Sequence, residues 1–143
     1  CLPFRAIKFR SMSDIGNIIR KYDDPVETER ITPLGKCLRI SRLDELPQIL
    51  NVLRGEMSLI GPRPDFYEHA LYFVEHVEKY NLRHLIKPGL SGLSQIRLGY
   101  VEGIEATKDK TNIDIYYVEN ASFSLDVKIF FSTILIVLKC YGK

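Results

Sequence analysis

The sequence predicts an α+β fold, a mostly helical single domain with a few short strands, and three observations lead to this prediction. The 143 residues, 45% hydrophobic and 27% charged, have the size and composition of one globular domain. Several segments repeat apolar residues at helical spacing, whereas few alternate as strands do. No run of about 18–20 uncharged apolar residues occurs, so no helix that crosses a bilayer perpendicularly is expected within these residues.

The N-terminal segment carries the clearest strand pattern. Residues 4–12, FRAIKFRSM, alternate so that a strand would place Lys8 and Arg10 on one face. Residues 13–33 are polar and predict a long loop. Downstream we expect a helix over 41–53, a second amphipathic helix over 66–80, a turn at 87–92, a short strand over 93–101, an exposed polar segment at 103–112, helix or strand at 113–118, and a C-terminal helix over 123–140.

The helix over residues 41–53 is predicted from a single apolar stripe. Ser41 is a candidate N-cap with Asp44 three residues on, a variant of the capping box, and Gly55 would end the helix. The stripe consists of leucines and one isoleucine that recur at helical spacing: Leu43, Leu46, Ile49, Leu50 and Leu53.

Charge and cysteine usage narrow the choice of partner and compartment. Residues 1–42 hold nine Lys or Arg against five Asp or Glu, a balance that suits an anionic partner, with a solvated basic face as the alternative. Three widely spaced cysteines form neither a disulfide framework nor a metal-binding pair, so a reducing compartment is expected. The chain begins with Cys1 rather than Met and has no signal-peptide pattern, and we expect it to be a fragment.

The C-terminal helix contains the apolar run IFFSTILIVL at residues 129–138. A helix that is apolar nearly all round is either fully buried or dipped into lipid. Burial of every face is hard to arrange in a domain this small. Interfacial placement is therefore favoured, with Lys128 and Lys139 reaching the head groups.

Asp44 and Glu45 are the strongest candidates for chemistry. They stand at a predicted helix start, preceded by Arg39 and Arg42, where the helix dipole and the arginines favour ionised carboxylates. An ionised Asp beside a second acid that can hold a divalent cation is a workable nucleophile toward phosphorus. The alternative is that both acids only stabilise the helix dipole.

Arg63 lies between two prolines in PRP, which restrict the backbone around it. A guanidinium held in this way suits bidentate phosphate binding, although an exposed turn arginine is the alternative. Lys8, Arg10 and Lys87 are compatible with the same anionic pocket. The sequence has no P-loop, dinucleotide-binding, HExxH or GxSxG motif, and no recognisable nucleic-acid module, so no nucleic-acid partner is expected.

Four stretches occur in an order that resembles the bacterial sugar transferase family, the monotopic phosphoglycosyl transferases. They are KFRSM at 8–12, RLDELPQILNVLRGEMSLIGPRP at 42–64, KPGLSG at 87–92 and DIYYVENASFSLDVKIFFST at 114–133. The resemblance extends from about Phe4 to Thr133. We therefore expect residues 1–143 to be a catalytic domain of this family, with interfacial helices.

The resemblance implies a reaction: transfer of a sugar 1-phosphate from a UDP-sugar to undecaprenyl or another polyprenyl phosphate, the first membrane step of surface glycan assembly. It implies that Asp44 is the nucleophile and forms a covalent phosphosugar intermediate, and that the adjacent Glu45 is a second catalytic residue and a Mg²⁺ ligand. Phosphate or substrate contacts are expected from the remaining candidates: Lys8, Arg10, Arg39, Arg42, Arg63, Lys87 and Gln95.

The resemblance also implies a place in the cell, the cytoplasmic face of the bacterial inner membrane, with membrane lipid and a second copy of the chain as candidate partners. The family's N-terminal membrane helix would precede Cys1. At residues 92–99 the sequence GLSQIRLG keeps Gln95 but departs from the family's usual GWAQVxGR. Two rival functions stay open: a non-catalytic peripheral membrane module of the same fold, and a soluble nucleotide hydrolase.

Overall fold

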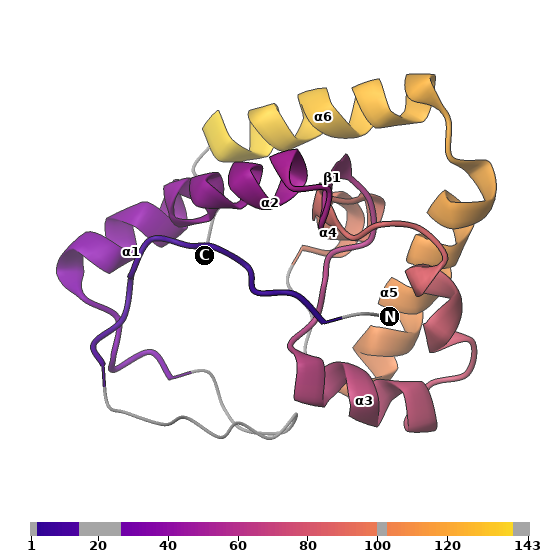
Figure 1. Ribbon diagram of the computed structural model, residues 1–143, viewed down its shortest axis with the longest axis horizontal. Coiled ribbons are helices and arrows are strands. Elements are labelled where there is room, and N and C mark those ends of the chain that lie inside the picture. The colour runs from indigo at the N-terminus through magenta and orange to yellow at the C-terminus, as the bar shows by residue number, and fades with distance from the viewer. Residues whose placement is uncertain (1–2, 15–26, 100–102, 139–143) are drawn as a thin grey trace.

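The structure, a computed structural model, describes residues 3–14, 27–99 and 103–138. It confirms an α+β fold in which helices dominate and one small parallel sheet is present (Figure 1). The elements are, in order, α1 (Pro33–Ile40), the 3₁₀-helix η1 (Leu43–Gln48), α2 (Ile49–Leu53), β1 (Ser58–Ile60), α3 (Tyr67–His76), the 3₁₀-helix η2 (Tyr80–His84), β2 (Gly89–Ser91), α4 (Leu93–Leu98), α5 (Ile104–Asn120) and α6 (Phe123–Leu138).

The two strands bring the IGPRP and KPGLSG motifs together. β1 and β2 are parallel, with Ser58 opposite Gly89 and Ile60 opposite Ser91. The backbones approach so closely that a Cβ on Gly89 would lie 2.1 Å from the backbone nitrogen of Gly61. Glycine is therefore required at this crossing, because there is no room for a side chain. The KPGLSG motif, expected only as a turn, also forms β2.

The strand predicted over residues 4–12 is wrong. The segment is extended, but its only ladder contact in the described residues is one bridge between Met12 and Ile31. Three of its backbone groups bond elsewhere: the Ile7 amide and the Arg5 carbonyl bond the Asn51 side chain, and the Phe9 amide donates to the carbonyl of Asp44. Alternation in the sequence does not report whether a partner strand is present.

Two further segments are helical where another structure was expected. Residues 93–98 form α4 instead of a strand, and residues 104–120 form one helix, α5, instead of an exposed segment followed by an ambiguous one. The interior face of α5 is polar, with Thr107, Thr111 and Asp114 buried, so apolar periodicity could not reveal it. Residues 15–26 of the expected long loop lie outside the described residues.

The predicted helix over 41–53 is divided into two. Ser41 does not cap its start. It ends α1, and its hydroxyl donates to the carbonyl of Cys37 at 2.9 Å. Arg42 then adopts a left-handed conformation with φ of 55°, and a 3₁₀ turn containing Pro47 precedes α2. Proline lacks the N–H that a longer α-helix would need at this position. The helix predicted over 66–80 likewise ends early, at His76.

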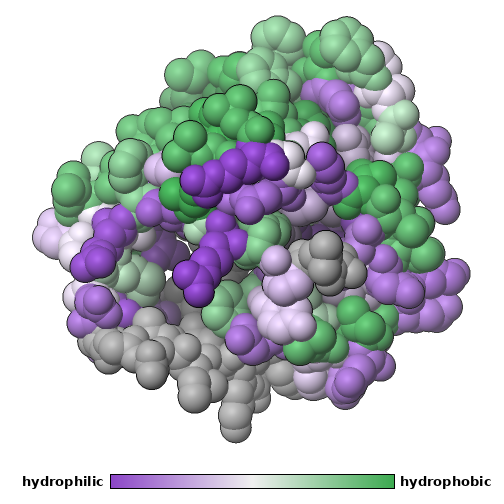
Figure 2. Space-filling model, in the orientation of Figure 1, coloured by the Kyte–Doolittle hydropathy of each residue, from purple (hydrophilic) through white to green (hydrophobic). Residues whose placement is uncertain are grey.

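The apolar stripe of η1 and α2 lies on the surface, as does most of α6. Figures 1 and 2 share one orientation, and apolar side chains gather along the upper edge, where α6 and α2 run. We call this the apolar face. It comprises the exposed side chains of Leu46, Ile49, Leu50 and Leu53 in η1 and α2, and of Phe130, Phe131, Ile134, Leu135 and Leu138 in α6.

The interior is small and partly polar. Among the described residues, two clusters of buried apolar side chains occur, one around Phe73, Val77 and Tyr80 and the other around Leu93, Tyr117 and Ile129. Along the described stretches, no helix has both the length and the apolarity needed to cross a bilayer. Only Ile129 of α6 is fully buried, so this helix is not the all-round core helix that its sequence would allow.

Candidate active site

The Asp44–Glu45 dyad lies in the first turn of η1. This 3₁₀-helix directly follows Arg42, which has a left-handed conformation. Asp44 is 9% exposed, and the side chain of Glu45 is 14% exposed. The amide of Phe9 donates to the Asp44 carbonyl at 2.9 Å. This backbone contact places the KFRSM segment against the dyad, although the two are about 35 residues apart in sequence.

Glu45 is the meeting point of three sequence motifs. Lys8 Nζ lies 2.9 Å from Glu45 Oε1. Arg63 forks onto the same carboxylate, with Nη1 3.0 Å from Oε2 and Nη2 bonded to Oε1. The structure therefore brings together the basic N-terminal segment, the dyad and the PRP turn, as the candidate site required. A two-point fork uses two guanidinium N–H groups and leaves three donors for a ligand.

The two carboxyl groups of the dyad have opposite electrostatic environments. Burial opposes ionisation of Glu45, but Arg63 and Lys8 outweigh it and lower the pKa of Glu45 to about 2. Burial, followed by the adjacent charge of Glu45, raises the pKa of Asp44 above its ordinary value despite lowering by Lys8 and Arg39. In the part of the chain that the structure describes, no cation forms an ion pair with Asp44.

Asn51 is a site-supporting residue that the sequence analysis missed. It is fully buried, accepts from the Ile7 amide at 3.0 Å and donates to the Arg5 carbonyl at 2.9 Å. A second donation reaches Glu56 at 2.6 Å. Asn51 thereby fixes the segment that delivers Lys8. Asn51 is the one polar residue of α2, ILNVL, but the sequence does not show that its side of the helix is the buried one.

The other predicted phosphate ligands differ in how they relate to the dyad. Arg39, in α1, acts on Asp44 through its charge, and Arg42 supplies the turn before η1. Lys87 reaches toward the end of α2, its Nζ 3.6 Å from where a Cβ on Gly55 would stand. Gln95 lies in α4 with Oε1 buried. Among the described residues, no hydrogen bond or ion pair joins Lys87 or Gln95 to the dyad, and their roles stay predictions.

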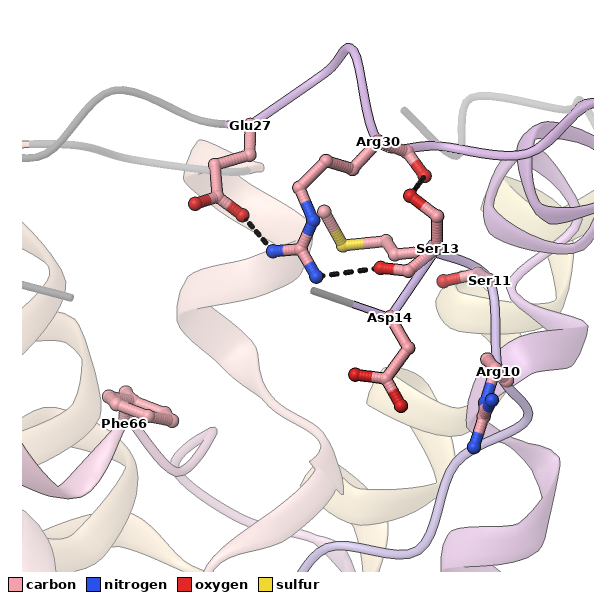
Figure 3. A pocket seen from close by; sticks show the side chains of 8 residues that line it. Arg10, Ser11, Ser13, Asp14, Glu27, Arg30 and Phe66 are labelled. Atoms are coloured by element: carbon pink, nitrogen blue, oxygen red, sulfur yellow. Dashed lines mark hydrogen bonds and ion pairs between the residues drawn. The ribbon is translucent and has the colours of Figure 1, made fainter. Parts of the chain in front are cut away.

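Arg10 lines a cavity of about 450 Å³ (Figure 3). Arg10 and Phe66, which follows the PRP motif closely, stand on opposite sides of it. Arg30 closes another wall, pairing with Glu27 and donating to the Ser13 carbonyl at 2.7 Å. A cavity of this volume is within the range of small-molecule sites, and it begins at the segment that crosses the dyad.

The donor set at the dyad fits a cation shared with a substrate, not a closed metal cage. Within the described ranges, no three His, Cys, Asp or Glu residues are grouped to hold a metal. Mg²⁺ is commonly held by one or two carboxylates together with substrate phosphates. Asp44 and Glu45 provide two adjacent carboxylates, of which Glu45 already contacts two cationic side chains.

Comparison with known proteins gives the same family as the motifs. A family model described as bacterial sugar transferase matches residues 2–140. The chain belongs to the bacterial sugar transferase family. Within this family, relatives from several bacteria align with nearly all of the chain.

An Aeromonas hydrophila protein named UDP-N-acetylgalactosamine-undecaprenyl-phosphate N-acetylgalactosaminephosphotransferase is 41% identical over 97% of this sugar transferase chain and 33% of its own length. A Klebsiella pneumoniae protein named UDP-glucose:undecaprenyl-phosphate glucose-1-phosphate transferase is 39% identical over 92% of the chain and 29% of its own. A Caulobacter vibrioides protein of the same name is 38% identical over 92% of the chain and 50% of its own length. The chain thus spans half or less of the length of these three relatives.

Proposed function

We propose that this chain is the catalytic part of an enzyme that transfers a sugar 1-phosphate from a UDP-sugar to undecaprenyl phosphate through a covalent intermediate on Asp44. The observation that carries the proposal is that the two carboxyl groups of the dyad differ in their ion-pair partners. Glu45 is held ionised by Arg63 and Lys8, whereas Asp44 beside it has no ion-pair partner in the described residues. The names of the relatives supply the donor and acceptor classes.

The reaction proceeds in two displacements at one phosphorus. An Asp44 carboxylate oxygen attacks the sugar-side phosphorus of the donor, and the bond to the bridging oxygen breaks with its electron pair leaving on UMP. An oxygen of undecaprenyl phosphate then attacks the same phosphorus. The Asp44–phosphorus bond breaks, the Asp44 carboxylate is restored, and the product is an undecaprenyl diphosphate sugar.

The cationic side chains around the dyad suit the charge of the donor. Arg63 keeps three N–H donors beyond its fork on Glu45, and Lys8 stands beside it. These groups would stabilise the negative charge that moves onto the departing phosphate. The cavity that begins at Arg10 offers room for the remainder of the donor (Figure 3).

A magnesium ion is part of the proposal. Glu45, with the donor phosphates, would hold it. When bound, the ion would neutralise phosphate charge and assist departure of UMP. The protein's own contribution is to keep Glu45 ionised, which Arg63 and Lys8 achieve.

The apolar face gives the enzyme its proposed position, resting on the cytoplasmic leaflet of the inner membrane. η1 carries the dyad at its start and continues directly into the exposed stripe of α2. Lipid contact by this stripe and by α6 would therefore hold Asp44 at the boundary between a water-soluble donor and a lipid acceptor. Exposed apolar surface of this extent is unusual unless it meets a partner or a membrane.

The proposal is tested with the full chain, Mg²⁺ and a panel that contains UDP-glucose and UDP-N-acetylgalactosamine. Mass spectrometry is expected to find a phosphosugar adduct on the parent protein and none on Asp44→Asn, with turnover reduced by about a thousandfold or more. Asp109→Asn, at an exposed aspartate of α5, is the control and should behave as the parent.

Each contrary result has its own meaning. Full turnover by Asp44→Asn would remove Asp44 as nucleophile. UMP release at full rate without undecaprenyl phosphate would identify a nucleotide hydrolase. Binding to vesicles without UMP release from any donor would identify a non-catalytic membrane module.

A further inference from the structure

A buried ionic cluster lies behind the PRP turn and is not used by the proposed chemistry. It consists of Asp65, Tyr80, Arg83, Lys110 and Asp114, and we call it the Arg83 cluster. The side chains of Arg83 and Asp114 are each 1% exposed and lie 2.7 Å apart as an ion pair. Asp65 and Lys110 are 18% and 13% exposed and form a second ion pair.

The cluster contacts the turn on both sides of Pro64, at Arg63 and at Asp65. Arg83 Nη2 donates to the Arg63 carbonyl at 2.7 Å, and Arg83 Nη1 pairs with the carboxylate of Asp65. That carboxylate also accepts from the Tyr80 hydroxyl at 2.6 Å and from Lys110. The turn is therefore held by Arg83 of η2 and Lys110 of α5, which lie 18 and 45 residues further along the chain than Asp65.

Stability alone is a poor reason for such a cluster. Desolvation of paired charges costs about as much as their attraction returns, and apolar residues of similar volume are often as stabilising. Burial opposes ionisation of Asp65, but Lys110 and Arg83 hold the pKa of Asp65 below its usual range. The cluster thus holds one turn through directional hydrogen bonds and ion pairs, which an apolar core could not provide.

We propose that the Arg83 cluster positions Arg63, so that Arg83, Asp65 and Tyr80 are positioning residues for the guanidinium that forks onto Glu45. Pro62 and Pro64 restrict the turn, and the cluster fixes the carbonyl of Arg63 between them. The guanidinium then meets Glu45 with two donors, which leaves its other three N–H groups for the donor phosphates. The proposal rests on the proposed function for its kinetic consequence, but its geometric consequence is independent of activity.

Two buried tyrosines offer a matched pair of variants. Tyr80 and Tyr117 are 0% and 3% exposed, and the hydroxyl of each donates to an aspartate at 2.6 Å. Tyr117 bonds Asp126, between α5 and α6 and outside the Arg83 cluster. Tyr80→Phe and Tyr117→Phe therefore each remove a hydroxyl bond to an aspartate. Tyr80→Phe also removes the acceptor of Arg83 Nη1 at 3.0 Å, a bond inside the Arg83 cluster, so only this variant is expected to loosen the turn.

The first measurement follows the guanidinium itself. In protein labelled with ¹⁵N-arginine, Arg63 is assigned by the resonance that Arg63→Lys lacks. Exchange of its guanidinium protons with water is expected to accelerate about tenfold in Tyr80→Phe and to stay unchanged in Tyr117→Phe. Because Arg83→Lys risks loss of the fold, Tyr80→Phe is the primary variant.

The second measurement is UMP release from UDP-N-acetylgalactosamine or UDP-glucose with undecaprenyl phosphate. Tyr80→Phe is expected to lower kcat about tenfold with KM changed less than about twofold, whereas Tyr117→Phe stays within about twofold of the parent in both. A parent that releases no UMP contradicts the proposed function and leaves the exchange measurement to decide this proposal. Equal proton exchange in the two variants would show that the cluster is structural only and overturn the proposal.

Discussion

Asp44 and Glu45 share a helical turn, yet their surroundings shift their pKa values in opposite directions. Arg63 and Lys8 overcome burial at Glu45, while burial and the charge of Glu45 act together on Asp44. Adjacent carboxyls with different environments can take different roles at one pH. Here Glu45 is the member that is charged at neutral pH, and Asp44 is the member left to react.

Arg63→Lys tests whether the fork, and not merely the charge, is needed. Lysine keeps a positive charge but has no planar fork that can grip both Glu45 oxygens. We expect the pKa of Glu45 to rise toward its ordinary value of 4.5 and turnover to fall about 10- to 100-fold. Carbon-13 NMR of the glutamate carboxyls and UMP release measure the two effects.

The control is Arg97→Lys, at an exposed arginine of α4 that lies over the Tyr116 ring, 5.7 Å from its centroid. It should leave both the Glu45 pKa and turnover unchanged. Undiminished turnover in Arg63→Lys would mean that a point charge is sufficient at this position.

Residue by residue, the sequence indicated the groups that meet at Glu45 but not those that hold them in place. A dyad after two arginines and an arginine between prolines each form a local pattern. Arg83 occurs in the plain string NLRHL, and its partners Asp65 and Asp114 are distant in the chain. Positioning residues of this kind become visible only when the tertiary contacts are known.

At the level of elements, helical periodicity predicted α6 and, as part of a longer helix, α2, but did not tell which environment their apolar sides meet. The same spacing of leucines serves a core face or a lipid face. In the structure Leu50 is 48% exposed and Phe131 is 59% exposed. The strand expected at residues 4–12 failed for a related reason, since its partner proved to be an asparagine side chain and a turn.

The proposed membrane contact of α2 and α6 predicts that Leu50→Glu with Phe131→Glu weakens binding of the chain to vesicles that contain anionic lipid. Each apolar side chain buried in lipid contributes about 1.5–3 kcal/mol, so the double variant should lower the partition coefficient by at least about a hundredfold. Flotation or cosedimentation with vesicles measures the bound fraction.

A matched control lies on α3, which runs along the opposite edge of the molecule in Figure 1. Leu71 and Val74 are 52% and 49% exposed, close to the values for the tested pair. Leu71→Glu with Val74→Glu should leave vesicle binding nearly unchanged. Equal loss in both double variants would contradict a membrane contact confined to the apolar face.

Over the whole molecule, the basic segment at residues 3–14 lies against the middle of the chain. Lys8 reaches Glu45 across 37 residues, and Phe9 bonds the backbone of Asp44. The charge asymmetry can be read directly from the sequence, and the α+β class could be predicted from its composition and apolar spacing. The path of the N-terminal segment could not, because it depends on Asn51 and on a turn that begins with a left-handed arginine.

This long-range pairing makes folding stability depend on pH in a way that one variant can isolate. The ordinary pKa of a glutamate is 4.5, and that of Glu45 in the folded chain is about 2. Above pH 4.5 Glu45 is ionised in both the folded and unfolded chain, so its full stabilisation is present. As the pH falls from 4.5 toward 2, the unfolded chain takes up the proton first, and the stabilisation is progressively lost.

Glu45→Gln should therefore lower the free energy of unfolding by about 1–3 kcal/mol at pH 6, because Arg63 and Lys8 lose their counter-charge. The difference from the parent should shrink steadily below about pH 4.5 as the parent loses the same interaction. Urea unfolding at pH 6, 5, 4 and 3 measures it. Glu105→Gln, at a side chain 86% exposed on α5, is the control and should differ little from the parent at any of these values. A Glu45→Gln difference that stays constant from pH 6 to pH 3 would mean that the ion pairs with Arg63 and Lys8 do not stabilise the fold.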